Sequence, residues 1–286
     1  MRVIDSHVHL WDPAALDYAW LADAPALNKP FLPPDLPHTP ANTQAAIFVQ
    51  ADCRADQALK EVDWVASLSA NWPQLAAVVA FAPISHGDNV APDLGQLLQR
   101  PLVRGVRELF QDRDPSLILD AATLAGARQV AAAELTFDAC IRFPQLAALA
   151  EFADRVPELL IVLDHMGKPP VASGELSAWS KGLRGLARRP NVVVKISGAG
   201  AEADPDRPLA PQALPFITET LQVFGAERSM IGSDWPVSFA ATAAYQDWIS
   251  TVDTAMAGAT AGERDSVAQG TATRIYRLDP ATDQED

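Results

Sequence analysis

Two histidines separated by one residue, His7 and His9, end an apolar run that begins almost at the first residue. Side chains alternate between the two faces of a strand, so both imidazoles are expected to project to the same side. Such a pair can bind one divalent metal ion or hold one substrate oxygen. The structural alternative is a strand with two satisfied polar residues near its exposed end.

Two later apolar runs also end in residues that can do chemistry. The run Leu159–Asp164 is followed by His165, and the run Met230–Ser233 is followed by Asp234. If these runs are parallel strands of one closed barrel, their carboxyl ends meet at the same face, and the first and last strands are neighbours. We therefore expect a cluster of three imidazoles and one carboxylate.

The elements that must position this cluster follow from an alternation along the whole chain. The predicted strands are Val3–His7, Ala45–Ala51, Ala76–Phe81, Leu102–Arg107, Glu134–Ala139, Leu159–Asp164, Val192–Ile196 and Met230–Ser233. The predicted helices are Asp56–Ser69, Asp93–Gln99, Leu117–Ala133, Phe143–Arg155, Leu176–Arg188, Ala213–Phe224, Ala241–Met256 and Gly262–Tyr276. Eight alternating pairs predict an α/β protein with a single (β/α)8 TIM barrel. An open doubly wound sheet is the alternative, but no Gly-x-Gly-x-x-Gly turn follows a strand.

Length and composition agree with one large domain. The chain has 286 residues, and a barrel needs roughly 250, so we assign residues 1–278 to the barrel and 279–286 to an acidic tail. A net charge of −14 argues against nucleic-acid and anionic-membrane partners. The sequence shows neither a signal peptide nor an apolar run as long as a membrane span, and its two cysteines form no CxxC motif. These features predict a cytoplasmic protein of undetermined oligomeric state.

One connection is unusually long. The segment Trp11–Thr43 contains six prolines between positions 25 and 40, which forbids a long helix and favours a fixed, extended loop. It directly follows the strand with the two histidines, so it is expected on the face where barrel active sites lie. We predict a lid or a pocket wall there.

Three segments resemble the amidohydrolase superfamily: Ile4–Asp12, Asp164–Pro169 and Gly232–Pro236. The closest similarity is to its amidohydrolase-2 branch, which contains L-fucono- and L-rhamnono-lactonases and 2-pyrone-4,6-dicarboxylate lactonases. Weaker similarities lie at Gly105–Arg107, Thr136–Asp138, Val194–Gly198 and Gly270–Tyr276. The resemblance implies a (β/α)8 barrel with catalytic residues His7, His9, His165 and Asp234.

The chain departs from the binuclear members of that superfamily. Those members have a carboxylated lysine on strand four and a histidine on strand five, whereas this chain has Arg107 and Glu108, then Asp138 and Cys140. A two-metal site is therefore not expected. One divalent metal, with zinc as the candidate, or no metal at all remains open.

The resemblance implies hydrolysis of a small sugar-acid lactone. A metal held by His7, His9 and Asp234, with His165 as a further ligand, would polarise the carbonyl. Without a metal, the histidines would stabilise the oxyanion by hydrogen bonds. In both cases Asp234 is the predicted general base. The alternatives are a metal-dependent decarboxylase of the same branch and a barrel kept as a non-catalytic binding protein.

Five further residues are candidates for contacting the substrate: Arg107, Lys195, Asp138, Trp11 and Trp235. An arginine fork suits hydroxyls or a carboxylate, although Arg107 can equally pair with Glu108 or Asp138. A lysine in an apolar strand needs a partner, which is either the substrate or a carboxylate inside the barrel. The two tryptophans either form walls for a sugar ring or pack in the core.

The remaining histidines and the cysteines are weaker candidates. His86 follows the third strand, but its surroundings indicate an exposed loop, and His38 lies in the proline-rich segment. Cys53 and Cys140 have no matched histidine motif, so we assign them no catalytic role.

Overall fold

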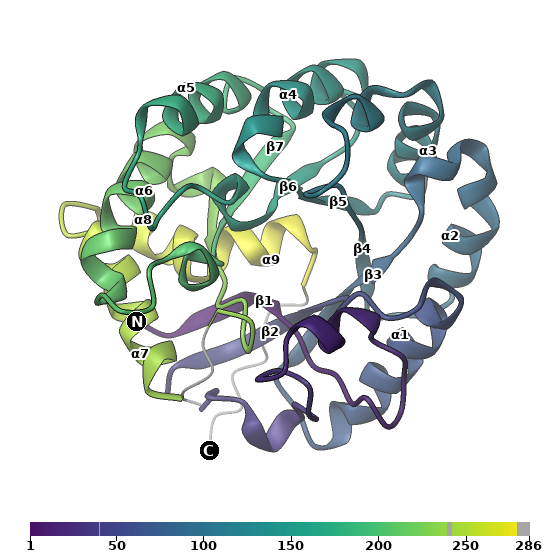
Figure 1. Cartoon of the computed structure of the whole chain (residues 1–286), viewed down its shortest axis with the longest axis horizontal. Coiled ribbons are helices and arrows are strands. Elements are labelled where there is room, and N and C mark those ends of the chain that lie inside the picture. Colours follow the sequence, from purple (N-terminus) through teal and green to yellow (C-terminus); the bar gives the residue numbers. More distant parts are fainter. Residues whose placement is uncertain (40, 239–241, 279–286) are drawn as a thin grey trace.

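The computed structural model describes residues 1–39, 41–238 and 242–278 and contains one eight-stranded parallel sheet (Figure 1). The strands are β1 (Val3–Val8), β2 (Thr43–Val49), β3 (Leu75–Phe81), β4 (Val103–Leu109), β5 (Thr136–Cys140), β6 (Ile161–Leu163), β7 (Val192–Ile196) and β8 (Ser229–Ile231). Each pairs with the next strand in the chain. The predicted (β/α)8 barrel is therefore confirmed.

The ring closes between its first and last strands, just beyond the end of β8. Val8 forms a parallel bridge with Trp235, and the Asp234 amide donates to the His7 carbonyl at 2.8 Å. The Ser6 hydroxyl also donates to the Ile231 carbonyl at 2.7 Å. These bonds fix the segment after β8 against β1, so that residues from both ends of the chain share one site.

Helices surround the sheet (Figure 1). They are α1 (Ala58–Ser67), α2 (Ala91–Leu97), α3 (Ala121–Ala132), α4 (Leu146–Arg155), α5 (Ser177–Leu186), α6 (Leu209–Phe224), α7 (Thr242–Ala255), α8 (Ala261–Asp265) and α9 (Thr271–Ile275). Helix α6 begins four residues earlier than predicted because Pro211 is tolerated in a first turn. The predicted final helix is interrupted by a π-helical turn at Ser266–Gly270.

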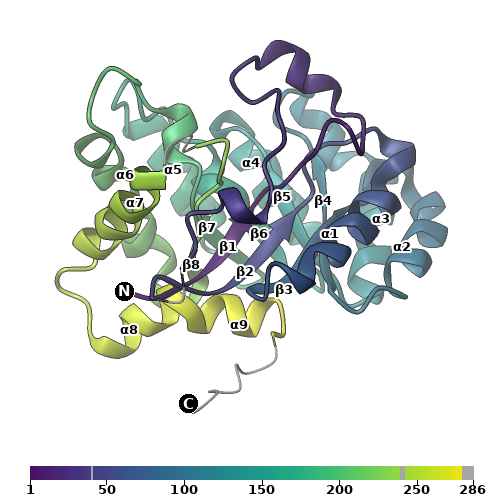
Figure 2. The same ribbon diagram turned by 90° about the horizontal axis from the view of Figure 1, so that it is seen from below.

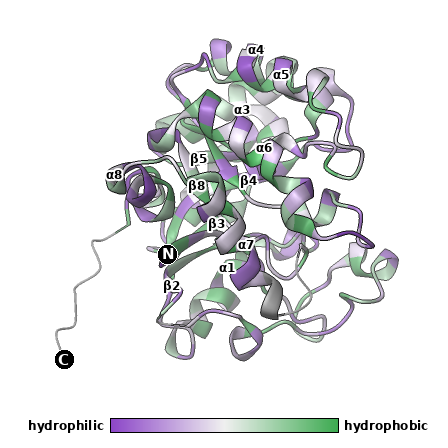
Figure 3. Cartoon of the chain, turned by 90° about the vertical axis from the view of Figure 1, so that its left-hand side faces the viewer, coloured by the Kyte–Doolittle hydropathy of each residue, from purple (hydrophilic) through white to green (hydrophobic). Residues whose placement is uncertain are grey.

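Apolar residues fill two regions. The larger lies between the strands and the surrounding helices, whose outer faces are more hydrophilic (Figure 3). The smaller lies inside the barrel and includes Ile4, Ile47 and Val162. Ile275 and Tyr276, from α9 and the residue after it, join this inner cluster and close the lower end of the barrel (Figure 2). The opposite end, where the strands terminate, remains available for a site. No described helix is long and apolar enough to cross a membrane.

The proline-rich connection after β1 packs around Trp11. The backbone of Trp11 forms an antiparallel bridge with Phe31. The indole N–H of Trp11 donates to the carbonyls of Leu27 and Lys29, at 3.1 and 2.9 Å. A short 3-10 helix at Ala19–Asp23 carries Trp20 into the same region. In Figure 2 this connection lies on the side opposite α9. The predicted acidic tail at 279–286 lies outside the described residues.

Candidate active site

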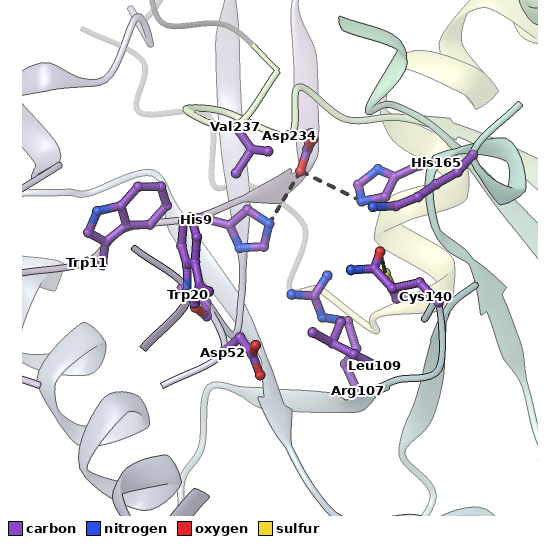
Figure 4. Close-up of a pocket in the computed structure, with 13 residues that line it drawn as sticks. His9, Trp11, Trp20, Asp52, Arg107, Leu109, Cys140, His165, Asp234 and Val237 are labelled. Atoms are coloured by element: carbon purple, nitrogen blue, oxygen red, sulfur yellow. Dashed lines mark hydrogen bonds and ion pairs between the residues drawn. The ribbon is translucent and has the colours of Figure 1, made fainter. Parts of the chain in front are cut away.

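The carboxylate of Asp234 lies at the centre of a histidine cluster at the carboxyl ends of the strands. Its Oδ1 atom is 3.3 Å from Nε2 of His9 and 3.7 Å from Nε2 of both His7 and His165. The Nε2 atoms of His7 and His9 are 3.1 Å apart. The structure thus brings together the four residues that the sequence analysis named for catalysis. Three of them, His9, His165 and Asp234, are drawn in Figure 4.

Each imidazole is oriented by a contact on its other nitrogen. Nδ1 of His9 lies 2.8 Å from the Val49 carbonyl oxygen, so this nitrogen carries the proton and Nε2 presents its lone pair. Nδ1 of His165 lies 2.9 Å from the Ser197 hydroxyl. Such outer contacts fix the ring plane of a ligating or catalytic histidine.

His7 has two charged neighbours on its Nδ1 side. Oδ1 of Asp164 lies at 3.3 Å and Nζ of Lys195 at 3.2 Å. Since Asp164 is the last residue before His165, the end of β6 supplies both a member of the cluster and a carboxylate that orients another member. The sequence pattern places Asp164 in the motif Asp164–Pro169 but predicts no role for it.

The backbone places two of these side chains in unusual conformations. Asp234 and His165 both have left-handed φ values, 59° and 55°, which costs a non-glycine residue about 1–3 kcal/mol. The carboxylate of Asp234 is further held by the Ser238 hydroxyl, which donates to Oδ2 at 2.7 Å. Strain that is maintained at a cluster of polar groups is typical of functional sites.

A buried charge network lies below the cluster. Nζ of Lys195 is 2.5 Å from Asp138 and 3.2 Å from Asp164, and the Tyr276 hydroxyl donates to Asp138 at 2.7 Å. Lys195 and Asp138 are completely buried and do not line the cavity above. Of the two alternatives given for Lys195, the geometry favours pairing with a carboxylate inside the barrel, and it places Asp138 as the partner of Lys195 and not in contact with a substrate.

Arg107 lies between that network and the cavity. Its Nη1 atom is 3.4 Å from Asp164 and 3.5 Å from Nε2 of His7, and its Nη2 atom donates to the Gln50 carbonyl. Arg107 also lines the cavity, as expected for a residue that contacts substrate. Its carboxylate partner is Asp164 rather than Glu108 or Asp138.

A cavity of about 210 Å³ opens above the cluster. Its lining residues are His9, Trp11, Trp20, Ala51, Asp52, Arg107, Leu109, Gln111, Cys140, His165, Lys168, Asp234 and Val237. In Figure 4, the two tryptophans face His165 and Cys140 across this space. The proline-rich connection therefore forms a pocket wall, one of the two roles predicted for it.

Of the two places considered for Trp235, a cavity wall or the core, the structure has the second. It is buried and does not line the cavity, and its ring packs against Phe31 at 5.5 Å between centroids. Phe31 in turn packs against Trp11 at 5.1 Å. Trp235 thus supports the aromatic wall from behind. Trp20, which sequence reasoning did not select, lines the cavity instead and donates to the Ala51 carbonyl at 2.8 Å.

The remaining candidates lie apart from the cluster. The side chain of His38 is 2% exposed and contacts Asp5 through Nε2 at 3.0 Å, and His86 is exposed. Cys53 is partly exposed, while Cys140 lies in the cavity wall, where burial raises the pKa of its thiol. A thiol with a raised pKa is a poor nucleophile at neutral pH.

Burial sets the protonation of the cluster. It lowers the pKa of His165 to about 4 and that of His7 well below its usual value, with the Lys195 charge adding to the effect on His7. Burial acts to raise the pKa of Asp234, but His165, His9 and His7 outweigh it and hold that pKa below its usual range. At neutral pH His7 and His165 are therefore neutral and Asp234 is ionised, and neutral imidazoles and an ionised carboxylate are the forms in which these groups bind a metal ion.

Comparison with known proteins identifies the family. A family model described as amidohydrolase matches residues 4–278. This chain belongs to the amidohydrolase family. An L-fucono-1,5-lactonase of Burkholderia ambifaria is 34% identical over 289 residues, with 98% of each chain covered. Two crystal structures of an amidohydrolase of Burkholderia multivorans are similar to this amidohydrolase.

The first of these structures has bound HEPES, with a TM-score of 0.85 and 31% identity, and the second has bound zinc, with a TM-score of 0.83 and 32% identity. Both matches cover 98% of this chain and 100% of the other. A 2,6-dihydroxybenzoate decarboxylase from Rhizobium, at 14% identity and a TM-score of 0.64, shares the fold alone.

The donor set of this amidohydrolase suits one metal ion. His7, His9 and Asp234 each offer a ligand atom, and these atoms lie within 4.8 Å of one another. Two imidazoles and a carboxylate with a further position open match the ligand types of catalytic zinc sites. A second set, formed by His7, Asp164 and His165, meets the same distance criterion. That set is less suitable because the positive charge of Lys195 lies 3.2 Å from Asp164.

Proposed function

We propose that this amidohydrolase opens the ring of a small, neutral sugar-acid lactone by hydrolysis. The observation that carries the proposal is the ionised carboxylate of Asp234, surrounded by His7, His9 and His165 beneath a cavity with an aromatic wall. The 34% identity to an L-fucono-1,5-lactonase over nearly the whole chain supports it.

The charges around the cavity favour a neutral substrate. Its lining contains two cations, Arg107 and Lys168, and two carboxylates, Asp52 and Asp234. Arg107 is also paired with Asp164 below the site. A lactone ring that carries two carboxylates would need more unpaired positive charge than this lining offers, whereas a hydroxylated ring needs only hydrogen-bonding groups and an apolar face.

In the proposed reaction, Asp234 is the general base. Its carboxylate accepts a proton from water as the water oxygen attacks the lactone carbonyl carbon. The C–O bond of the ring then breaks, and Asp234 returns the proton to the departing ring oxygen. The product is a hydroxy acid, which ionises at neutral pH and releases one proton for each ring opened.

Arg107 and the imidazoles position the reacting groups. The guanidinium lies at the cavity floor and can donate to the carbonyl oxygen, where negative charge develops. The contacts of His9 with Val49 and of His165 with Ser197 fix both rings before substrate arrives. A divalent metal, proposed to be zinc and held by His7, His9 and Asp234, would supply Lewis-acid polarisation of the carbonyl.

A pH-indicator assay against a panel of aldonolactones, run with and without a chelator, tests the proposal. The expected result is one proton released for each lactone opened, with activity lost on chelation and restored by added zinc. Activity that survives chelation would reject the metal while retaining the lactonase. Proton uptake with release of CO₂ from carboxylated substrates would indicate the decarboxylase instead, and no turnover on any panel member would contradict the proposal.

A further inference from the structure

The cavity contains a lysine that the proposed mechanism does not use. Lys168 lies on the connection between β6 and α5, three residues after His165, and lines the cavity. The buried cations nearby are paired, Arg107 with Asp164 and Lys195 with both Asp138 and Asp164. Among the described residues, the Lys168 ammonium has no hydrogen bond or ion pair. Its donors are therefore available to a ligand.

The turn that carries Lys168 is held firmly. All four residues from His165 to Lys168 have left-handed φ values between 50° and 72°. The Lys168 amide donates to the His165 carbonyl at 2.8 Å, and the buried indole of Trp179 donates to the Met166 carbonyl at 2.8 Å. The lysine backbone is thereby fixed relative to the catalytic histidine, so a substrate placed against His165 meets Lys168 at a defined part of its ring.

The cavity lining includes the polar side chain of Gln111 as well as Lys168, whereas the wall facing His165 is aromatic. Gln111 and Cys140 lie on the lining with Lys168, and the Cys140 thiol contacts the Gln111 side-chain oxygen at 3.5 Å. Burial raises the pKa of Cys140 and the positive charge of Lys168 opposes that rise, which agrees with their proximity. Trp11 and Trp20 occupy the facing side (Figure 4). An apolar face opposite hydrogen-bond donors suits a sugar ring, which has C–H groups on its faces and hydroxyls at its edge.

We infer that Lys168 is a specificity-determining residue whose Nζ atom donates hydrogen bonds to a ring hydroxyl of the lactone. This inference rests on the proposed lactonase function and goes beyond it, because it assigns the selection of hydroxylated rings to one side chain. Lys168 makes the same contact in the ground state and in the transition state, so it acts mainly on KM rather than on kcat.

The test compares a parent aldonolactone with analogues that each lack one ring hydroxyl, for the wild type and for Lys168→Met. Methionine keeps an unbranched chain and removes the charged donors. We expect kcat/KM of the variant for the parent lactone to fall about 10- to 100-fold, mainly through KM. Removal of one particular ring hydroxyl from the lactone should lower kcat/KM of the wild type by a similar factor. The same removal should leave kcat/KM of Lys168→Met unchanged.

Two further variants serve as controls. Lys181→Met removes an exposed lysine of α5 outside the cavity and should behave as the wild type does. Lys168→Arg keeps a cationic donor and should recover part of the lost affinity. If removal of each hydroxyl changes kcat/KM of Lys168→Met by the same factor as in the wild type, the inference about Lys168 is wrong, although the lactonase function stands. If the wild type opens none of the lactones, both fail.

Discussion

Gly198 lies directly against the imidazole of His165. A Cβ atom added at Gly198 would come within 2.5 Å of Nδ1 and Cγ of the ring, closer than real Cβ contacts. The preceding residue, Ser197, places its hydroxyl 2.9 Å from the same Nδ1. The end of β7 therefore fixes this histidine by packing and by hydrogen bonding together.

Gly198→Ala should accordingly lower kcat, in addition to the loss of stability expected for alanine at a left-handed position. Gly198 has a φ of +70°, so alanine adds backbone strain of about 1–2 kcal/mol as well as the clash with His165. Gly174→Ala is a matched control, since Gly174 has a φ of +71° and nothing within 4 Å of an added Cβ. Urea unfolding should show a loss of stability in both variants, larger in Gly198→Ala because of the clash, whereas kcat should fall only in Gly198→Ala. Equal kcat values would refute the positioning role of Gly198.

Replacement of Asp234 by asparagine should abolish catalysis and leave the fold intact. Asparagine keeps the size of the side chain and an oxygen that can accept from Ser238, but it cannot take up a proton. Loss of a general base costs about 10²- to 10⁴-fold in rate, and kcat should fall by at least that factor. Asp206→Asn, at an exposed position, is the control. Wild-type turnover in Asp234→Asn would reject the assigned role.

The paired arrangement of Lys195 predicts a stability defect in Lys195→Met. This change leaves the carboxylate of Asp138 buried without its cation and removes one of the two cations beside Asp164, where Arg107 remains. Loss of one partner from a buried pair costs about 3–5 kcal/mol. Urea denaturation should detect a decrease of that size in the free energy of unfolding. Unchanged stability combined with a raised KM would instead support the substrate contact suggested by the sequence.

The barrel and the four central residues could be predicted from the sequence. Both follow from the hydrophobic periodicity of the strands and helices and from the order of these elements along the chain. Alternating strand and helix patterns define the fold, and residues after a strand must lie at one face of a parallel barrel. His165 and Asp234 were found in this way although they are 69 positions apart.

The depth of a side chain was not predictable in the same way. Strand alternation shows that Lys195 and Asp138 point inward, but it does not separate the cavity floor from the charge network below it. The direction of Trp235 was also hidden, because Asp234 has a left-handed φ that redirects the following residue. Ser197 and Asp164 could have been proposed as orienting groups, since each stands at the end of a strand beside the site.

The lowered pKa of His165 makes stability dependent on pH. Its pKa is about 4 in the folded protein because of burial, against a usual value of 6.5. Between these two values the unfolded chain binds a proton at this position and the folded protein does not. The free energy of unfolding therefore rises with pH in this window, and the stability is lost as the pH falls from 6.5 towards 4.

Urea denaturation of the wild type and of His165→Gln, at several pH values between 7 and 4 and with a chelator present, tests this linkage. Glutamine does not titrate, so the variant should lose less stability than the wild type over this range. The difference should approach about 3 kcal/mol, from the size of the pKa change. Titratable groups away from the site contribute equally to both proteins and cancel in the comparison. Parallel pH profiles for the two proteins would mean that His165 titrates in the folded protein as it does in the unfolded chain.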